Sequence, residues 1–231
     1  MQNSFDFVRP QGGKRPEQTM DEWKTKPSDR FVLKWIKINI SARITPRLIR
    51  LKWLRPWMIT LCSTSVGVFA GVVFALGSGL TAGLLAACAQ VLDGVDGQFS
   101  RLASMQSSAG AFLDSVLDRY FDAALVIGLT VYLIRLPVDL PAPLVLVMAF
   151  FAVSGSTLIS YTTARAESLG IPLGKPTLAS KGTRMSVIVL CGWASILWAP
   201  APILALAYLA LHPNIVVFRR IYLAYSHSDP P

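Results

Sequence analysis

Six apolar stretches follow one another along most of this chain, and each is close to the about 20 residues that a helix needs to cross a bilayer. Inside lipid every backbone N–H and C=O group needs a partner within the protein, so these stretches are expected to be helical. The composition agrees, since 53% of the 231 residues are hydrophobic and only 15% are charged. The sequence thus predicts an all-α, polytopic membrane protein with six transmembrane helices. They are expected at residues 57–77, 79–98, 109–134, 142–166, 183–199 and 201–218.

The chain divides into four parts by composition. Residues 1–29 are rich in Gln, Gly, Pro, Lys and Glu and are expected to be a mobile polar segment. Residues 30–55 form a juxtamembrane part, residues 56–220 hold the transmembrane domain, and residues 221–231 form a C-terminal tail.

The juxtamembrane part reads as a basic amphipathic helix. Its apolar residues recur near helical spacing and alternate with lysines and arginines, which is typical of a helix lying in the membrane interface. We expect a break near Thr45-Pro46, because proline removes a helical hydrogen bond. A helix packed on the bundle is the alternative. The apolar residues are Phe31, Trp35, Ile38, Ile49 and Trp53.

Basic residues are concentrated before the first apolar stretch. Residues 1–55 hold 13 of the 22 Lys and Arg residues, against 5 of the 13 Asp and Glu residues. This pattern favours contact with anionic lipids over nucleic acid, so no nucleic-acid partner is expected. By the positive-inside rule the N-terminus and the loops that share its side face the cytoplasm. The predicted location is therefore a cell or inner membrane.

Four aspartates interrupt the second and third apolar stretches. Asp93 and Asp96 are three residues apart, and Asp114 and Asp118 are four apart, so each pair shares one helix face. Carboxylates inside a membrane are costly and usually functional. Divalent cations would relieve their mutual repulsion, and ligands that are all oxygen favour Mg²⁺, Mn²⁺ or Ca²⁺ over zinc. Two such cations bridged by carboxylates would suit displacement at phosphorus, and the predicted cofactor is two Mg²⁺ or Mn²⁺ ions.

Three neighbouring residues fit the same chemistry. Gly97 and Gly110 have no side chain, which lets a ligand approach the helix backbone. Arg101 lies just beyond and can bind a phosphate in bidentate fashion. Two other interpretations were weighed. The aspartates could pair with arginines as structural contacts within the bundle, or relay protons in a proton- or ion-coupled transporter.

The spacing of these residues resembles a known signature. The pattern Asp-x2-Asp-Gly-x2-(Ala/Ser)-Arg-x8-Gly-x3-Asp-x3-Asp runs from Asp93 to Asp118 with every interval kept, and it is similar to that of the CDP-alcohol phosphotransferase family. The one departure is Ser100, where the family usually has Ala. The six stretches and the juxtamembrane helix also resemble this family over about residues 30–220.

The resemblance implies a transfer reaction in which a CDP-linked alcohol gives its phosphoryl-alcohol part to the hydroxyl of a second alcohol and releases CMP. It implies that Asp93, Asp96 and Asp114 are metal ligands, and that Asp118 is both a ligand and the general base. The residues implied to contact the CDP moiety are Thr60, Gly97, Ser100, Arg101 and Gly110.

The acceptor side is expected near three basic residues. Arg165 ends the fourth stretch, and Lys181 and Arg184 open the fifth, so they are expected to meet at the cytoplasmic mouth of the bundle. In family members that use inositol phosphate, the same region binds the phosphate of the acceptor. The alternative is that these residues only enforce topology and reach toward lipid headgroups.

Within the family, Asp-Gly-Val-Asp-Gly followed by Leu-Asp-Ser-Val-Leu-Asp-Arg is closest to di-myo-inositol phosphate phosphate synthases. The resemblance implies a CDP-inositol or CDP-diacylglycerol donor, with inositol phosphate or a lipid alcohol as acceptor. It also implies a homodimer in contact with membrane lipids.

Overall fold

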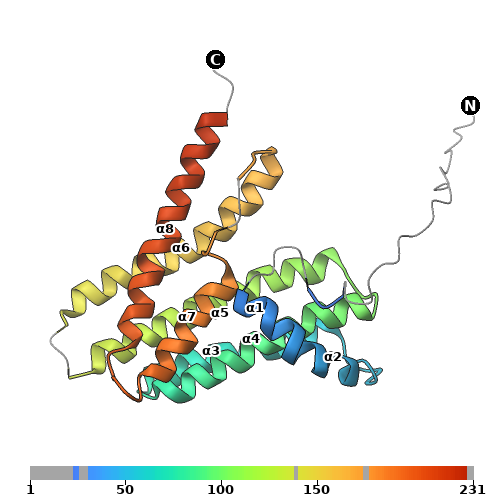
Figure 1. Ribbon diagram of the computed structural model, residues 1–231, viewed down its shortest axis with the longest axis horizontal. Helices are drawn as coiled ribbons and strands as arrows, with labels where there is room; N and C mark the ends of the chain where they lie inside the picture. Colours follow the sequence, from blue (N-terminus) through green and yellow to red (C-terminus); the bar gives the residue numbers. More distant parts are fainter. Residues whose placement is uncertain (1–22, 26–30, 138–139, 174–176, 228–231) are drawn as a thin grey trace, which may run out of the picture.

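A computed structural model describes residues 23–25, 31–137, 140–173 and 177–227, and this part of the chain consists of helices joined by turns, with no strand (Figure 1). The all-α prediction is therefore confirmed for the described residues. The mobile segment predicted at residues 1–29 lies outside them, apart from residues 23–25.

A helix stands at each of the six predicted apolar stretches. Proline and serine side chains mark several helix starts: Pro56 occupies the first turn of α3, and the Ser107 and Ser180 hydroxyls accept backbone N–H bonds at the starts of α5 and α7. The last helix runs past the end expected at 218. The six are α3 (Pro56–Ala75), α4 (Gly79–Leu102), α5 (Ser108–Arg135), α6 (Ala142–Leu169), α7 (Lys181–Ala194) and α8 (Pro202–His227).

Three of these helices, α3, α6 and α8, are long and apolar enough to cross a membrane. Helices α4 and α5 are long enough, at 24 and 28 residues, but carry the charged residues of the aspartate motif. Helix α7 has only 14 residues, fewer than a full crossing needs. The six-span count therefore stays a prediction. Large apolar side chains such as Phe69, Phe150 and Phe218 are exposed, as expected of an integral membrane protein that faces lipid.

The bundle is built around α3, which packs against both α4 and α5, while α6 pairs with α8 and α7 lies between α4 and α8. Buried Phe74, Leu125, Leu129 and Met185 belong to one apolar core that joins these helices. The α3–α5 contact is unusually close, since a Cβ atom placed on Gly128 would lie 1.9 Å from the carbonyl oxygen of Gly71. Only glycine permits the two backbones to meet there.

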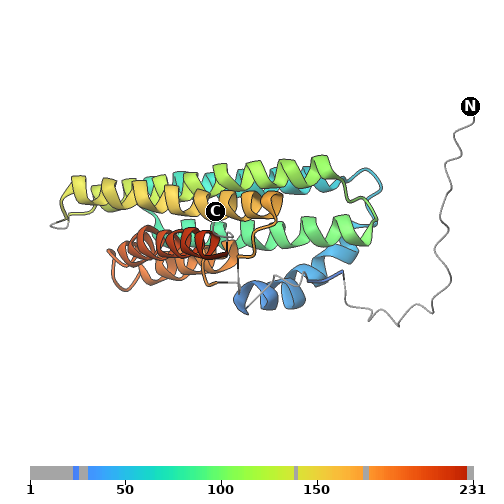
Figure 2. The same cartoon turned by 90° about the horizontal axis from the view of Figure 1, so that it is seen from above.

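The juxtamembrane part forms α1 (Phe31–Ile36), a π-helical segment η1 (Lys37–Ser41) and α2 (Ala42–Leu48). These elements lie along one side of the bundle, where η1 and α2 contact α4 (Figure 2). The break expected near Thr45-Pro46 was wrong. Pro46 lies inside α2, because the buried Thr45 is anchored to α4 through Gln98 and holds the chain in helical geometry. The helical irregularity is η1 instead.

The face turned toward α4 carries polar as well as apolar residues, and Ile44 and Leu48 of α2 pack against a buried cluster that includes Val95 and Phe99 of α4. Lys37, Ser41 and Thr45 follow one another at intervals of four and are buried, and the Ser41 hydroxyl donates to the Val91 carbonyl at 3.0 Å. Trp35, at 59% exposure, and Ile38 point outward. Packing on the bundle is thus present in the structure, and a location of the outer face in the membrane interface stays a prediction.

The close α3–α5 contact predicts that Gly128→Ala destabilises the bundle. The added methyl group meets backbone rather than a flexible side chain, and such overpacking costs about 1–3 kcal/mol of unfolding free energy. The thermal midpoint in detergent should fall by about 2–4 °C per kcal/mol. Ser65→Thr is the matched control, because it adds one methyl group at an exposed position of α3. Equal midpoints for the two variants would contradict this account.

Candidate active site

Three of the four aspartates converge where α4 and α5 lie opposite one another. Carboxylate oxygens of Asp93, Asp114 and Asp118 lie within 4.8 Å of one another, and each side chain is partly buried. Asp96 is one turn further along α4, is buried, and lines a cavity together with Asp114. The helical spacing of each pair thus places all four residues on facing surfaces.

This arrangement fits a divalent cation. The three carboxylates each offer an oxygen, the ligand type that Mg²⁺ and Mn²⁺ prefer, and their separation allows several of them to reach one ion. Asp96, beside the cavity and adjacent on the same helix face as Asp93, would be the natural ligand on the cavity side.

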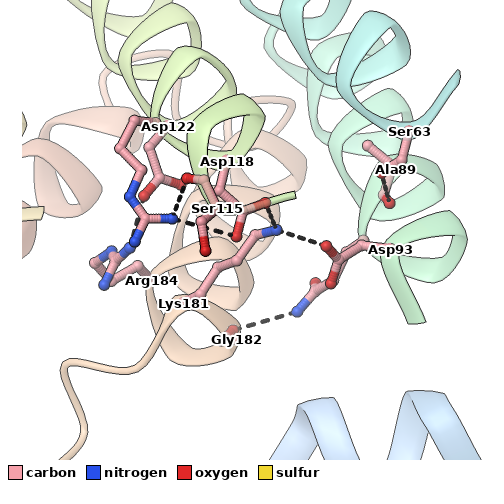
Figure 3. A network of polar contacts seen from close by, with 11 residues as sticks. Ser63, Ala89, Asp93, Ser115, Asp118, Asp122, Lys181, Gly182 and Arg184 are labelled. Carbon is pink, nitrogen blue, oxygen red and sulfur yellow. Dashed lines mark hydrogen bonds and ion pairs between the residues drawn. The ribbon is translucent and has the colours of Figure 1, made fainter. Parts of the chain in front are cut away.

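Lys181 also belongs to this cluster. Its ammonium group donates to an oxygen of Asp93 at 2.7 Å and to an oxygen of Asp118 (Figure 3). It also lies 5.5 Å from the centre of the Phe121 ring, a cation–π contact. Lys181 is the first residue of α7, and the Gln90 amide donates to the carbonyl of the next residue, Gly182, at 3.3 Å. The start of α7 is therefore fixed against α4, with its lysine between the carboxylates.

Arg184 has a different partner. Its guanidinium donates to Asp122 at 2.6 Å (Figure 3). It also donates to the Ala179 carbonyl at 2.7 Å, and Arg184 is only 3% exposed. Asp122 was missed by sequence reasoning, although it continues the four-residue spacing of Asp114 and Asp118. This buried ion pair joins α5 to α7 one turn beyond the aspartate cluster.

Arg165 is exposed, and its hydrogen bond goes to Ser168 on its own helix, at 3.5 Å. The three basic residues predicted to form one acceptor site therefore have three different settings. Lys181 lies among the aspartates, Arg184 is buried against Asp122, and Arg165 is at the surface of α6.

A cavity of about 590 Å³ opens beside the aspartates. Asp96 and Asp114 form part of its wall, and Arg55 and Trp57 stand at the start of α3 on another side. The cavity is also lined by all five residues that the family resemblance assigns to the CDP moiety. They are Thr60, Gly97, Ser100, Arg101 and Gly110.

Two features keep the cavity wall open. A Cβ atom on Gly97 would meet only the terminal nitrogens of Arg101, at 3.5 and 3.9 Å, so a ligand can approach the α4 backbone there. Gly110 lies in the first turn of α5, where its N–H group donates to the Ser107 hydroxyl at 3.0 Å. The glycines thus lie in the wall of the cavity, as the sequence predicted.

Sequence reasoning also missed Gln98. It lies between two motif residues but points to the other side of α4, where it is fully buried and bonded to the N-terminal part of the chain. A buried position for a long amide could have been read from its place among apolar residues, but its partners could not.

Residues 53–221 match the family model described as CDP-alcohol phosphatidyltransferase. The bifunctional IPC transferase and DIPP synthase of Archaeoglobus fulgidus is 32% identical over 137 residues, which are 59% of this chain and 26% of that protein. The archaetidylinositol phosphate synthase of Methanothermobacter thermautotrophicus is 32% identical over 169 residues, 71% of this chain and 80% of that protein. The chain thus spans only about a quarter of the length of the first relative.

Two solved structures of Mycobacterium tuberculosis phosphatidylinositol phosphate synthase are similar to the fold. One has CDP-DAG bound, and the other is in complex with manganese and citrate. For each of them the TM-score is 0.71, the identity is 25% and 82% of this chain is covered. The likeness covers 96% of the chain with CDP-DAG and 91% of the chain with manganese and citrate. The family match over residues 53–221 and the likeness of fold lead to one conclusion: the chain belongs to the CDP-alcohol phosphatidyltransferase family.

Proposed function

We propose that this protein transfers a phosphoryl-alcohol group from a CDP-alcohol to the hydroxyl of a second alcohol and releases CMP. The observation that carries the proposal is the single cavity lined by Thr60, Gly97, Ser100, Arg101 and Gly110, whose wall continues into Asp96 and Asp114. A site for a nucleotide therefore adjoins a site for metal, which is what displacement at a nucleotide-linked phosphorus requires.

The donor is proposed to lie in this cavity. A volume of about 590 Å³ is in the range of small-molecule sites, and Arg101 offers a planar guanidinium to the diphosphate. The M. tuberculosis neighbour binds CDP-DAG, and the A. fulgidus relative is named for IPC transfer and DIPP synthesis. The proposed donors are accordingly CDP-diacylglycerol and CDP-inositol.

Two divalent ions, Mg²⁺ or Mn²⁺, are proposed to be held by Asp93, Asp96, Asp114 and Asp118. The carboxylate cluster and the manganese bound by the M. tuberculosis neighbour support this. When bound, such ions would neutralise the diphosphate and make its phosphorus a better electrophile.

Asp118 is proposed to act as general base. Its carboxylate lies among the proposed metal ligands, where it would accept the proton of a hydroxyl that attacks the bound phosphorus. In the reaction the acceptor hydroxyl gives its proton to Asp118, and its oxygen bonds to the phosphorus that carries the donor alcohol. The bond from that phosphorus to the oxygen of CMP breaks, and CMP leaves with the electron pair.

The acceptor is proposed to be inositol phosphate or a lipid alcohol. The relatives named archaetidylinositol phosphate synthase and phosphatidylinositol phosphate synthase favour the first. Lys181 is the basic residue best placed to bind the acceptor's phosphate, because its ammonium group adjoins the proposed base. Arg184 is proposed to hold α7 in place through Asp122, and an acceptor contact by Arg165 stays a prediction.

The site is proposed to face the cytoplasm, on the side of the basic N-terminal part. We also propose a homodimer, which the family resemblance implies.

CMP release tests the proposed function and its metal. The purified protein, given CDP-diacylglycerol or CDP-inositol with inositol phosphate or a lipid alcohol in turn, should release CMP only with a matching pair. Release should stop in excess chelator and return with Mg²⁺ or Mn²⁺, because four carboxylates repel an uncompensated diphosphate. Substrate flux across sealed vesicles without CMP release would favour a transporter, and full turnover in chelator would exclude the two-metal account.

Asp118→Asn should separate chemistry from binding. We expect turnover to fall by about 10²- to 10⁴-fold, the usual effect of losing a general base, while the CDP-alcohol donor still binds. Asp93→Asn should instead weaken metal and donor binding together. Glu167→Gln, which changes an exposed carboxylate of α6, is the control and should retain turnover. Near-normal turnover in Asp118→Asn would remove this residue from the base role.

Lys181→Ala should raise the KM of a phosphorylated acceptor by about ten- to a hundredfold, the equivalent of one charged hydrogen bond. The KM of the donor should move much less. Lys52→Ala, an exposed lysine before α3, serves as control. The acceptor role is excluded if both KM values rise together, or if an acceptor without phosphate is used equally well. Arg165→Ala in the same assay decides whether Arg165 belongs to the site.

A further inference from the structure

Residues 23–25 lie against the last turns of α4, next to the donor cavity. Two α4 side chains three residues apart donate to their backbone carbonyls. The Nε of Arg101 bonds to the Trp23 carbonyl at 2.9 Å, and the amide nitrogen of Gln98 bonds to the Lys24 carbonyl at 2.8 Å. The main chain of this short segment is thus held by two side chains of α4.

Gln98 connects the segment to the juxtamembrane helix. Its amide nitrogen also donates to the Lys37 carbonyl at 2.9 Å, and its amide oxygen accepts from the Thr45 hydroxyl at 2.9 Å. Both N–H groups and one acceptor site of this fully buried amide are therefore used to fix N-terminal elements on α4. One turn earlier, a Cβ on Gly94 would lie 2.6 Å from the Ser41 hydroxyl, so glycine is needed for this close approach.

Arg101 faces both the segment and the cavity. Its Nε is used by Trp23, while its two terminal nitrogens lie beside Gly97, a residue of the cavity wall. A free arginine side chain has several rotatable bonds and loses conformational entropy when it binds a ligand. An arginine already held at Nε loses less, so fixing it in advance improves affinity.

We propose that residues 23–25 act as a positioning strap for the donor site. The Trp23 carbonyl holds Arg101 at Nε, so that the terminal nitrogens are directed at the diphosphate of a CDP-alcohol. The strap is proposed to act through Arg101, so its effect is expected on the donor and not on the acceptor. This inference rests on the donor role proposed above for the cavity.

The test compares two truncations of the chain in detergent. Removal of residues 1–25 deletes the strap, whereas removal of residues 1–22 keeps Trp23 and Lys24 and is the matched control. We expect the first truncation to raise the KM of the CDP-alcohol about three- to tenfold, the range of one hydrogen bond, and to leave the acceptor KM unchanged. The control truncation should behave as the full chain. If the longer truncation does not accumulate, replacing Trp23, Lys24 and Thr25 together by Gly keeps the chain length and loosens the strap.

Arg101→Ala in the full chain and in the longer truncation completes a double-mutant cycle. If the strap acts through Arg101, truncation should no longer raise the donor KM once Arg101 is Ala. An equal rise in both backgrounds, a rise in both substrates' KM, or no rise at all would overturn the strap. If Arg101→Ala raises the donor KM but truncation does not, the strap fails and the proposed function stands. If Arg101→Ala leaves the donor KM unchanged, the donor role of the cavity fails as well.

Discussion

Mutual repulsion of carboxylates is the constraint on which the arrangement of this protein depends. Asp93, Asp114 and Asp118 bring their oxygens within 4.8 Å of one another between two helices, where the surroundings screen charge poorly. In this structure Lys181 supplies a positive charge between two of them. Because Lys181 belongs to α7, its place between the carboxylates depends on how α7 packs. The Gln90 contact to Gly182 and the Arg184–Asp122 pair fix that helix against α4 and α5.

The two sides of helix α4 make different contacts. On one side Asp93, Asp96 and Gly97 belong to the aspartate cluster and the cavity. On the other side Gly94 and Gln98 receive the N-terminal elements. Arg101 bonds to the Trp23 carbonyl and also lines the cavity proposed for the donor. It therefore connects the N-terminal part of the chain with that cavity. The residues between the members of the motif therefore build a second contact surface on α4.

The family and the fold support the proposed class of chemistry but do not identify its substrates. Relatives of this chain carry different names, which are IPC transferase and DIPP synthase, archaetidylinositol phosphate synthase and phosphatidylinositol phosphate synthase. The three basic residues predicted to meet at one place have separate contacts. Lys181 bonds to Asp93 and Asp118, Arg184 bonds to Asp122, and Arg165 bonds to Ser168 on its own helix.

The sequence alone determined where the helices lie and which aspartates share a helix face, because both follow from local spacing. Apolar stretches near bilayer length give helices at the expected places, and intervals of three and four place Asp93 with Asp96 and Asp114 with Asp118. Gly97, Ser100, Arg101 and Gly110 of the cavity wall could be named because the motif keeps its intervals, and Thr60 was named from the family resemblance. Tertiary structure decided the contacts between residues of different helices, which local spacing does not determine. The partners of Lys181 and Arg184 depend on how α7 packs against two other helices. The continuation of α2 through Pro46 depends on the anchor at Gln98, and the strap depends on carbonyl groups that every residue possesses and no sequence pattern marks.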